Sequence, residues 1–127
     1  MWHHVAVPLS DKQLDAWRSV LNTHARVVGL VETAFAEAGL PPLAWYDVLW
    51  ALRRAPERKL RLSELAESLT VSRGGATKLV DRLAGQGLLR REACEGDQRG
   101  RYAAITPAGI ALLRKMWPVY RRVLEWG

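Results

Sequence analysis

The sequence predicts a mainly α-helical domain that carries one small β-hairpin, and three observations support this fold class. Residues 62–69 and 72–86 have the pattern of two short amphipathic helices about three residues apart, which is the spacing of a helix-turn-helix. Residues 88–93 and 101–105 are strand-like, with a turn-rich stretch between them. Long segments with apolar stripes precede and follow this unit. We therefore expect a winged helix-turn-helix with additional N- and C-terminal helices, in a single domain over residues 1–127.

The first predicted helix extends from Ser10 to Gly39 and is long for a small domain. Ser10 and Gln13 have the spacing of a capping box, and apolar residues then recur about every 3.5 positions as far as Ala38. Gly39 suits a C-cap, because glycine readily adopts the left-handed conformation that ends many helices. A helix of about 30 residues needs an apolar partner along its length, and a second subunit is one such partner.

The second predicted helix, residues 43–55, follows a pair of prolines and is apolar nearly all round. A helix of that composition is expected to be buried. A proline ends it, and residues 57–61 have the composition of a charged connector to the helix-turn-helix. Beyond the hairpin, Thr106 and Pro107 predict the start of a final helix, with Thr106 as N-cap and Pro107 as the first helical residue.

The segment over residues 72–86 combines an apolar stripe with a polar and basic outward side. Ser72 is a good N-cap, and Gly87 stands where a left-handed C-cap belongs. Asp81 interrupts the basic side, and we expect it to pair with Arg82 or with an arginine of the hairpin. Most basic helix faces are merely solvated, so this pattern alone assigns no function. The stripe consists of Ala76, Leu79, Val80 and Leu83.

Several short motifs follow one another between residues 43 and 109. They are Leu65-Ala66, Val71-Ser72-Arg73, Thr77-Lys78-Leu79-Val80-Asp81-Arg82-Leu83, Gly87-Leu88-Leu89-Arg90-Arg91, Asp97-Gln98-Arg99-Gly100 and Ile105-Thr106-Pro107-Ala108-Gly109. Each motif alone is a weak signal, whereas the ordered set at these spacings is specific. The set resembles the MarR family of winged-helix regulators.

This resemblance implies a function and a division of the domain. It implies a sequence-specific, double-stranded DNA-binding transcriptional regulator: a homodimeric repressor of a pseudo-palindromic operator, released by a small aromatic or phenolic anion. Residues 10–39 and 107–127 are then dimerisation helices, and residues 43–106 are the winged helix-turn-helix core. The family normally has a further C-terminal helix that helps to form the dimer. The sequence ends before such a helix, so a shortened member and part of a longer chain both remain open.

The candidate DNA-binding residues lie in the second helix of the helix-turn-helix and in the hairpin. That helix enters the major groove, where Arg can pair with guanine and Lys and Thr suit phosphates or base edges. Gly74-Gly75 would allow close approach to DNA, although a frayed helix end is the other interpretation. The resemblance implies that Arg99 enters the minor groove and that Asp97 orients it. The full set is Ser72, Arg73, Gly74, Gly75, Thr77, Lys78, Arg82, Arg99 and Arg101.

A second set of residues is a candidate lining for an effector cleft between the long first helix and the buried second one. The resemblance implies that such a cleft binds a small aromatic or phenolic anion. The alternative is that this Trp-rich set belongs to the core. The candidate residues are Trp17, His24, Trp45, Tyr46 and Trp50.

The placement of charge favours a polyanionic partner. The formal net charge is +6. Residues 1–71 hold 8 basic and 8 acidic residues, whereas residues 72–127 hold 11 and 5. The entire excess therefore lies from the second helix of the helix-turn-helix onward, which suits a polyanionic partner such as DNA.

The sequence lacks the patterns that characterise other classes of protein. We expect no enzyme, because the sequence has no Gly-rich phosphate loop, nucleophile elbow or metal-ligand spacing. The adjacent pair His3-His4 lacks further ligands, so neither a metal nor another cofactor is expected. Cys94 is the single cysteine, and there is no apolar run long enough for a membrane span and no signal peptide, which fits a cytoplasmic protein. The alternative function is a winged helix used for architectural or protein contacts without an effector.

Overall fold

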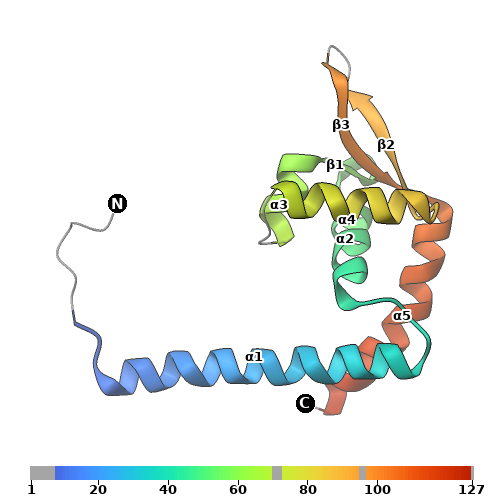
Figure 1. Cartoon of the computed structure of the whole chain (residues 1–127). Helices are drawn as coiled ribbons and strands as arrows, with labels where there is room; N and C mark the ends of the chain where they lie inside the picture. The colour runs from blue at the N-terminus through green and yellow to red at the C-terminus, as the bar shows by residue number, and fades with distance from the viewer. Residues whose placement is uncertain (1–7, 70–72, 95–96, 127) are drawn as a thin grey trace.

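The computed structural model describes residues 8–69, 73–94 and 97–126, which form helices around a small antiparallel sheet (Figure 1). The predicted mainly α, winged helix-turn-helix class is confirmed. None of the described helices combines the length and the apolar character needed to cross a membrane. In chain order the elements are α1 (Asp11–Glu37), α2 (Leu43–Arg54), the 3₁₀ turn η1 (Pro56–Arg58), β1 (Lys59–Arg61), α3 (Leu62–Leu69), α4 (Arg73–Gly85), β2 (Leu89–Cys94), β3 (Asp97–Ile105) and α5 (Pro107–Trp126).

Helix α1 begins and ends with the signals that its sequence carries. The Ser10 hydroxyl accepts the Gln13 N–H at 3.1 Å, and the Gln13 side chain accepts the Ser10 N–H at 2.9 Å, so the predicted capping box is present. At the other end Gly39 has a φ of 71°, and the Leu40 N–H donates to the Phe35 carbonyl at 2.8 Å. This left-handed glycine lets the chain turn sharply towards α2.

Only the C-terminal half of α1 packs against the rest of the chain. Val31 and Phe35 are buried, and this half lies against α5. Every residue from Asp11 to Arg26 is exposed, and in Figure 1 this blue half extends away from the other helices. The expectation that this helix needs a partner along its length is thus not met within one chain.

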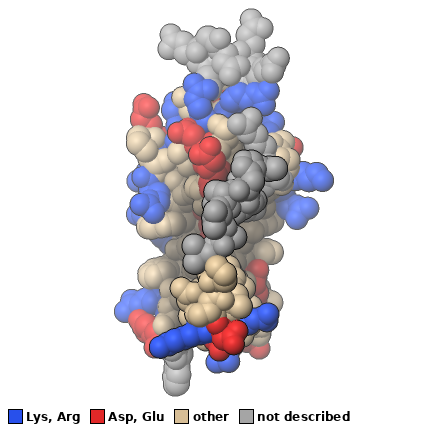
Figure 2. Space-filling view, turned by 90° about the vertical axis from the view of Figure 1, so that its left-hand side faces the viewer, with Lys and Arg blue, Asp and Glu red and all other residues tan. Residues whose placement is uncertain are grey.

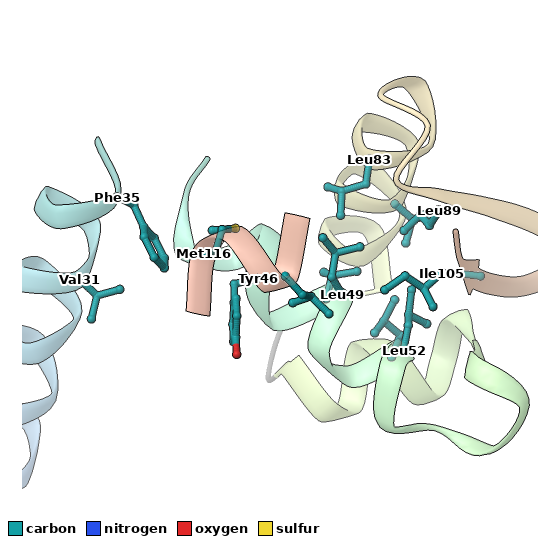
Figure 3. Close-up of a cluster of buried hydrophobic side chains, with 14 residues drawn as sticks. Val31, Phe35, Tyr46, Leu49, Leu52, Leu83, Leu89, Ile105 and Met116 are labelled. Carbon is teal, nitrogen blue, oxygen red and sulfur yellow. The ribbon is translucent and has the colours of Figure 1, made fainter. Parts of the chain in front are cut away.

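Helix α2 lies at the centre of the fold. Val48, Leu49 and Leu52 have no exposed surface, and Figure 3 shows the latter two among side chains from α4 and the sheet. The same helix also exposes Trp50, at 41%, so the expectation that it is buried nearly all round is wrong for one side. The buried cluster comprises Val31, Phe35, Tyr46, Val48, Leu49, Leu52, Leu65, Val80, Leu83, Leu89, Ala103, Ile105, Leu113 and Met116.

The sheet has the order β1-β3-β2, with antiparallel pairing throughout. The predicted charged connector over residues 57–61 is wrong in its second half, because Lys59–Arg61 forms β1 against β3. This strand has only three residues, and Lys59 and Arg61 flank its single apolar residue, Leu60. The sequence pattern was therefore too short and too charged to predict a strand. The predicted turn is also shorter than expected, since β3 already starts at Asp97.

The end of α4 and the start of α5 meet at the base of the hairpin. Gly87 has a φ of 74°, which agrees with the predicted C-cap after α4. The Thr106 hydroxyl accepts the Gly109 N–H at 3.2 Å, which confirms Thr106 as the N-cap of α5. The same hydroxyl donates to the Gly87 carbonyl at 2.7 Å, and the Thr106 N–H donates to the Leu88 carbonyl at 3.2 Å. These bonds join the two helices to the hairpin at one point.

Candidate nucleic-acid interface

Helix α4 presents one apolar side to the core and the other side to solvent. Ala76, Val80 and Leu83 are buried, as the predicted stripe requires. Helix α3 packs against this side of α4 and completes the helix-turn-helix. The buried stripe fixes the rotation of α4 about its axis, so the residues off the stripe must face outwards.

The predicted DNA-binding residues of α4 lie on this outward side. Gly74, Gly75, Lys78 and Arg82 are exposed, and Thr77 is half-buried. Lys78 and Arg82 are four residues apart, which stacks them on successive turns of one face. Arg73 is the first residue of α4. Ser72 and the side chain of Arg73 lie outside the described residues.

The predicted hairpin residues lie in β3. Arg101 is exposed, whereas the side chains of Asp97 and Arg99 lie outside what the structure describes. Figure 2 looks onto the side of the molecule where α4 begins. Lys and Arg side chains gather there near the strands and along both flanks, with some Asp and Glu between them. Helix α4 packs against β2, so basic residues of the helix and of the strands lie on neighbouring elements.

A pocket of about 280 Å³ joins α4 to the sheet, and we call it the basic pocket. Thr77 and Arg101, which lie far apart in the sequence, both line it. Sequence reasoning missed Arg61 and Ser63, which also line it, because it did not recognise β1 and so could not bring residue 61 beside α4. The lining consists of Arg61, Leu62, Ser63, Thr77 and Arg101.

Two cationic side chains of β1 lie over the ring of Tyr102 on β3. The Arg61 guanidinium carbon lies 5.3 Å from the ring centroid and the Lys59 ammonium nitrogen 5.1 Å from it. Both distances are in the range of cation–π attraction. Tyr102 pairs with Arg61 in the sheet register, which places the two side chains on the same face of the sheet.

Two carboxylates form ion pairs with basic residues of the sheet. Glu92 lies 3.6 Å from Lys59 and 2.9 Å from Arg90, and Asp81 of α4 lies 3.4 Å from Arg91 of β2. The prediction that Asp81 pairs with a hairpin arginine is confirmed by this last ion pair. Because both of its side chains are substantially exposed, the pair contributes little stability. The ion pair does hold the Arg91 guanidinium group beside α4.

The predicted effector residues divide into two groups. Tyr46 and Trp50 line a cleft of about 560 Å³ between α2 and α5, which we call the α2–α5 cleft. Trp17 and His24 lie on the exposed half of α1, and Trp45 is half-buried against the core, so none of these three lines the cleft. Within one chain the five candidate residues therefore do not line a single cleft. The second wall of the α2–α5 cleft comes from α5 and not from α1.

The α2–α5 cleft combines aromatic walls with charged residues. Tyr46 and Tyr120 meet edge to face, with ring centroids 5.0 Å apart. Burial raises the pKa of both phenols, and the neighbouring Asp47 carboxylate raises each further. The complete lining is Tyr46, Asp47, Trp50, Arg53, Leu113, Arg114, Trp117, Tyr120 and Leu124. Such a lining suits a flat aromatic molecule that carries negative charge.

Within the described ranges 8–69, 73–94 and 97–126, no cluster of three or more His, Cys, Asp or Glu side chains could hold a metal ion. The side chain of Cys94 is outside the description.

Comparisons with known proteins agree with this geometry. The sequence model of the MarR family matches residues 38–100. The HTH-type transcriptional regulator MhqR of Bacillus subtilis (strain 168) is 31% identical over 106 residues, which are 81% of this chain and 64% of MhqR. The chain thus spans slightly less than two thirds of the length of that relative.

Two solved structures from Streptomyces coelicolor have the same fold. Sco3205, a MarR family transcriptional regulator in complex with DNA, is 27% identical, with a TM-score of 0.83 over 98% of this chain and 78% of that one. AbsC, another MarR family transcriptional regulator, is 28% identical, with a TM-score of 0.79 over 94% of this chain and 80% of that one. Like MhqR, both are transcriptional regulators and not enzymes. Together with the winged helix-turn-helix and its basic outward side, these matches show that the chain belongs to the MarR family.

Proposed function

We propose that the chain is a sequence-specific regulator of transcription that binds double-stranded DNA through α4 and the hairpin. The observation that carries this proposal is the exposed basic side of α4, which continues through the basic pocket to Arg101 of β3. An α-helix fits the major groove, and the strands beside it can then reach the sugar–phosphate backbone. The DNA complex of Sco3205, a protein of the same fold, supports this interpretation.

Each predicted DNA-binding residue has a role in this proposal. Lys78 and Arg82 project from successive turns of α4 towards phosphates or base edges, and Thr77 contributes a hydroxyl at the margin of the groove. Gly74 and Gly75 leave the N-terminal end of α4 without side chains, so its backbone can approach a phosphate closely. Ser72 and Arg73 extend this contact at the start of the helix, and Arg99 and Arg101 bind from the hairpin.

The regulator acts as a homodimer in this proposal, with α1 and α5 at the interface. Leu14, Trp17 and Leu21 lie at positions i, i+3 and i+7 of α1 and are 39%, 59% and 45% exposed. A groove of about 520 Å³ between α1 and α5, with Leu30, Val119 and Val123 in its lining, continues this apolar surface. A monomer would leave this surface in water, whereas a second copy would bury it.

A two-fold dimer presents two copies of α4 to successive major grooves, about 10 bp apart, so the operator is a pseudo-palindrome. A repressor is the form of regulation that we propose for such an operator. Sedimentation velocity tests the dimer. If the chain binds DNA but sediments as a monomer at micromolar concentration, the proposed dimer is wrong.

The α2–α5 cleft is the proposed effector site, and a small aromatic or phenolic anion is the proposed ligand. Trp50 and Trp117 can stack on an aromatic ring, while Arg53 and Arg114 can pair with a carboxylate or phenolate. Benzoate is a suitable probe, with benzyl alcohol as the uncharged control of similar shape. Benzoate should quench the tryptophan fluorescence and release DNA, and Arg114→Gln should weaken both effects. Equal responses to benzoate and benzyl alcohol would contradict an anion site.

Selection of duplexes from a random-sequence library tests the central proposal. The chain should enrich a pseudo-palindromic sequence, and footprinting should protect both of its half-sites. Retention of duplexes without any enriched sequence would instead favour the architectural function. Absence of DNA binding would overturn the proposal.

A further inference from the structure

A second hollow lies on the other side of Trp50 from the α2–α5 cleft, and we call it the α2–α3 groove. It has a volume of about 640 Å³ and is bounded by α2, η1, β1 and the end of α3. Arg54 and Ser68 are among its polar lining residues, and both are exposed. Most of the lining is apolar and consists of Trp50, Ala51, Ala55, Pro56, Leu60 and Leu69. The groove therefore suits the apolar part of a ligand.

The cleft and the groove lie on adjacent sides of α2. Tyr46, Trp50 and Arg53 line the cleft, and the residue that follows each of them lines the groove. Successive residues of an α-helix are about 100° apart, so the two hollows are separated by roughly a quarter of the helix circumference. On a helix about 11 Å in diameter this is a path of roughly 10 Å. Asp47 and Trp50 line both hollows and form the ridge between them.

Trp50 is a large apolar side chain that the fold leaves uncovered on this ridge. It is 41% exposed, and the Arg53 guanidinium carbon lies 5.9 Å from the centroid of its ring. A ligand confined to the α2–α5 cleft would cover the indole from the cleft side alone. A ligand that crosses the ridge would cover it from the groove side as well, and this additional burial of apolar surface stabilises the complex.

The charges fix the direction in which such a ligand lies. Arg53 and Arg114 line the cleft, and neither has a carboxylate within ion-pair distance among the residues that the structure describes. The anionic group of the ligand is therefore held at the cleft end. Asp47 stands on the ridge, where its carboxylate would repel a second negative charge. The part of the ligand that crosses the ridge is therefore an uncharged chain.

We propose that the effector is an aromatic anion with a flexible apolar chain, and that this chain passes over Trp50 into the α2–α3 groove. The inference rests on the proposed effector site and names the class of its ligand. A chain of about six carbon atoms, together with the ring, spans a path of this length. Its end contacts Leu60 of β1 and Leu69 of α3, so the effector touches the helix-turn-helix directly. A short ligand in the cleft contacts α2 and α5 instead.

A series of para-alkylbenzoates tests the length of the ligand. Isothermal titration calorimetry of the DNA-free chain compares benzoate with its para-ethyl, para-butyl and para-hexyl derivatives. The affinity should rise roughly fourfold for each methylene group that becomes buried, so the hexyl derivative should bind much more tightly than the ethyl derivative. Equal affinities of the ethyl and hexyl derivatives would overturn the proposal.

Filling the groove separates a specific site for the chain from unspecific hydrophobic adsorption. Ser68→Phe adds a ring from an exposed position in the groove, and Glu67→Phe, at the exposed neighbouring position outside the lining, is the matched control. Ser68→Phe should bind para-hexylbenzoate no more tightly than para-ethylbenzoate, whereas Glu67→Phe should keep the full gain of the wild type. If Ser68→Phe also keeps the full gain, the chain does not occupy the groove.

Nuclear Overhauser effects locate the chain of the ligand without any substitution. With labelled leucine methyl groups, the terminal methyl group of para-hexylbenzoate should show contacts to Leu60 and Leu69. Contacts to Leu113 and Leu124 of the cleft alone, or to no leucine, would overturn the proposal. If the wild-type chain binds neither benzoate nor its derivatives, the effector site and this inference are both wrong. If benzoate binds and the hexyl chain adds nothing, only this inference is wrong.

Discussion

The Glu32 carboxylate on α1 accepts a hydrogen bond from the backbone N–H of Leu43, the first residue of α2, at 2.8 Å. Pro42 stands at the N-cap of α2 and has no side chain that could accept this N–H. A residue of the preceding helix therefore supplies the cap, and its negative charge lies at the positive end of the α2 dipole. The bond also fixes how α1 meets the central helix.

Loss of this cap should destabilise the fold. Glu32→Ala is expected to lower the free energy of unfolding by about 1 kcal/mol, the usual cost of removing an N-cap acceptor. Glu32→Gln keeps an acceptor oxygen and should lose less. Glu37→Ala, five residues later on an exposed part of α1, is the control. Urea unfolding at one fixed protein concentration measures all three, and an equal effect of Glu32→Ala and Glu37→Ala would argue against the cap.

Asp47 should make stability depend on pH. Burial, and then the nearby Glu32 carboxylate, raise the pKa of Asp47 above its ordinary value of 3.8. A carboxyl group with a raised pKa in the folded state stabilises the fold fully below pH 3.8, and this contribution is lost as the pH rises through the raised value. Asp47→Asn should thus increase stability at pH 7 and lose that advantage below pH 3.8. Asp15→Asn on the exposed half of α1 is the control for thermal unfolding across this range. A constant difference between Asp47→Asn and the wild type at all pH values would refute the prediction.

Gly109 should tolerate no side chain. A Cβ atom at this position would overlap the Leu88 carbonyl oxygen and lie 2.7 Å from the Ile105 side chain. Gly109→Ala is therefore expected to cost about 1–3 kcal/mol of unfolding free energy by overpacking. Gly85→Ala, at the end of α4 with no neighbouring atom within 4 Å, should change stability by roughly 0.5 kcal/mol or less. Chemical unfolding curves measure the stability of both variants. Equal losses of unfolding free energy would contradict the prediction.

Lys78 should contribute directly to DNA binding. Its side chain is exposed on the outward side of α4, and Lys78→Ala is expected to cost about 1–3 kcal/mol of binding free energy on the selected duplex. Lys115→Ala removes the same charge from an exposed position on α5 and should bind nearly as the wild type does. Fluorescence anisotropy titrations measure both. Equal losses would mean that net charge alone, and not α4, determines affinity.

Removal of the Asp81 carboxylate should strengthen DNA binding. Asp81→Asn frees Arg91 from an ion pair of 3.4 Å and removes a negative charge beside the basic residues of α4. The variant should bind any duplex more tightly and show a steeper salt slope. Glu125→Gln, which breaks the Arg121 pair on α5, should leave the slope unchanged. Unchanged affinity in Asp81→Asn would mean that Arg91 does not face the DNA.

The sequence allowed the helix ends to be predicted well, because they depend on residues a few positions apart. The Ser10–Gln13 capping box, the left-handed Gly39 and Gly87, and the Thr106 cap are each set by local hydrogen bonds or by backbone preference. The apolar stripe of α4 could be predicted equally well, because it depends only on helical spacing. These local signals were sufficient for the order of elements and hence for the winged helix-turn-helix class.

Features that depend on long-range pairing could not be predicted in the same way. Strand β1 exists because Lys59 and Arg61 pair with Ala104 and Tyr102. The residues around β1 in the sequence do not indicate which distant strand they pair with. Arg61 was therefore missed as a pocket residue. The second wall of the α2–α5 cleft was missed for the same reason, since Trp50 and Trp117 come together only through tertiary packing.

The bonds from Thr106 to Gly87 and Leu88 have a mechanical consequence. They attach the N-terminal end of α5 to the base of the hairpin, and Leu113, Arg114 and Trp117 of the same helix line the α2–α5 cleft before Pro118. The stretch from Pro107 to Trp117 is roughly 15 Å long at about 1.5 Å per residue, and no proline interrupts it between the two places. A tilt of about 5° over this length would displace the hairpin end by roughly 1.3 Å, which is enough to break a hydrogen bond. We therefore expect a change of side-chain packing in the cleft to reach the base of the hairpin through this part of α5.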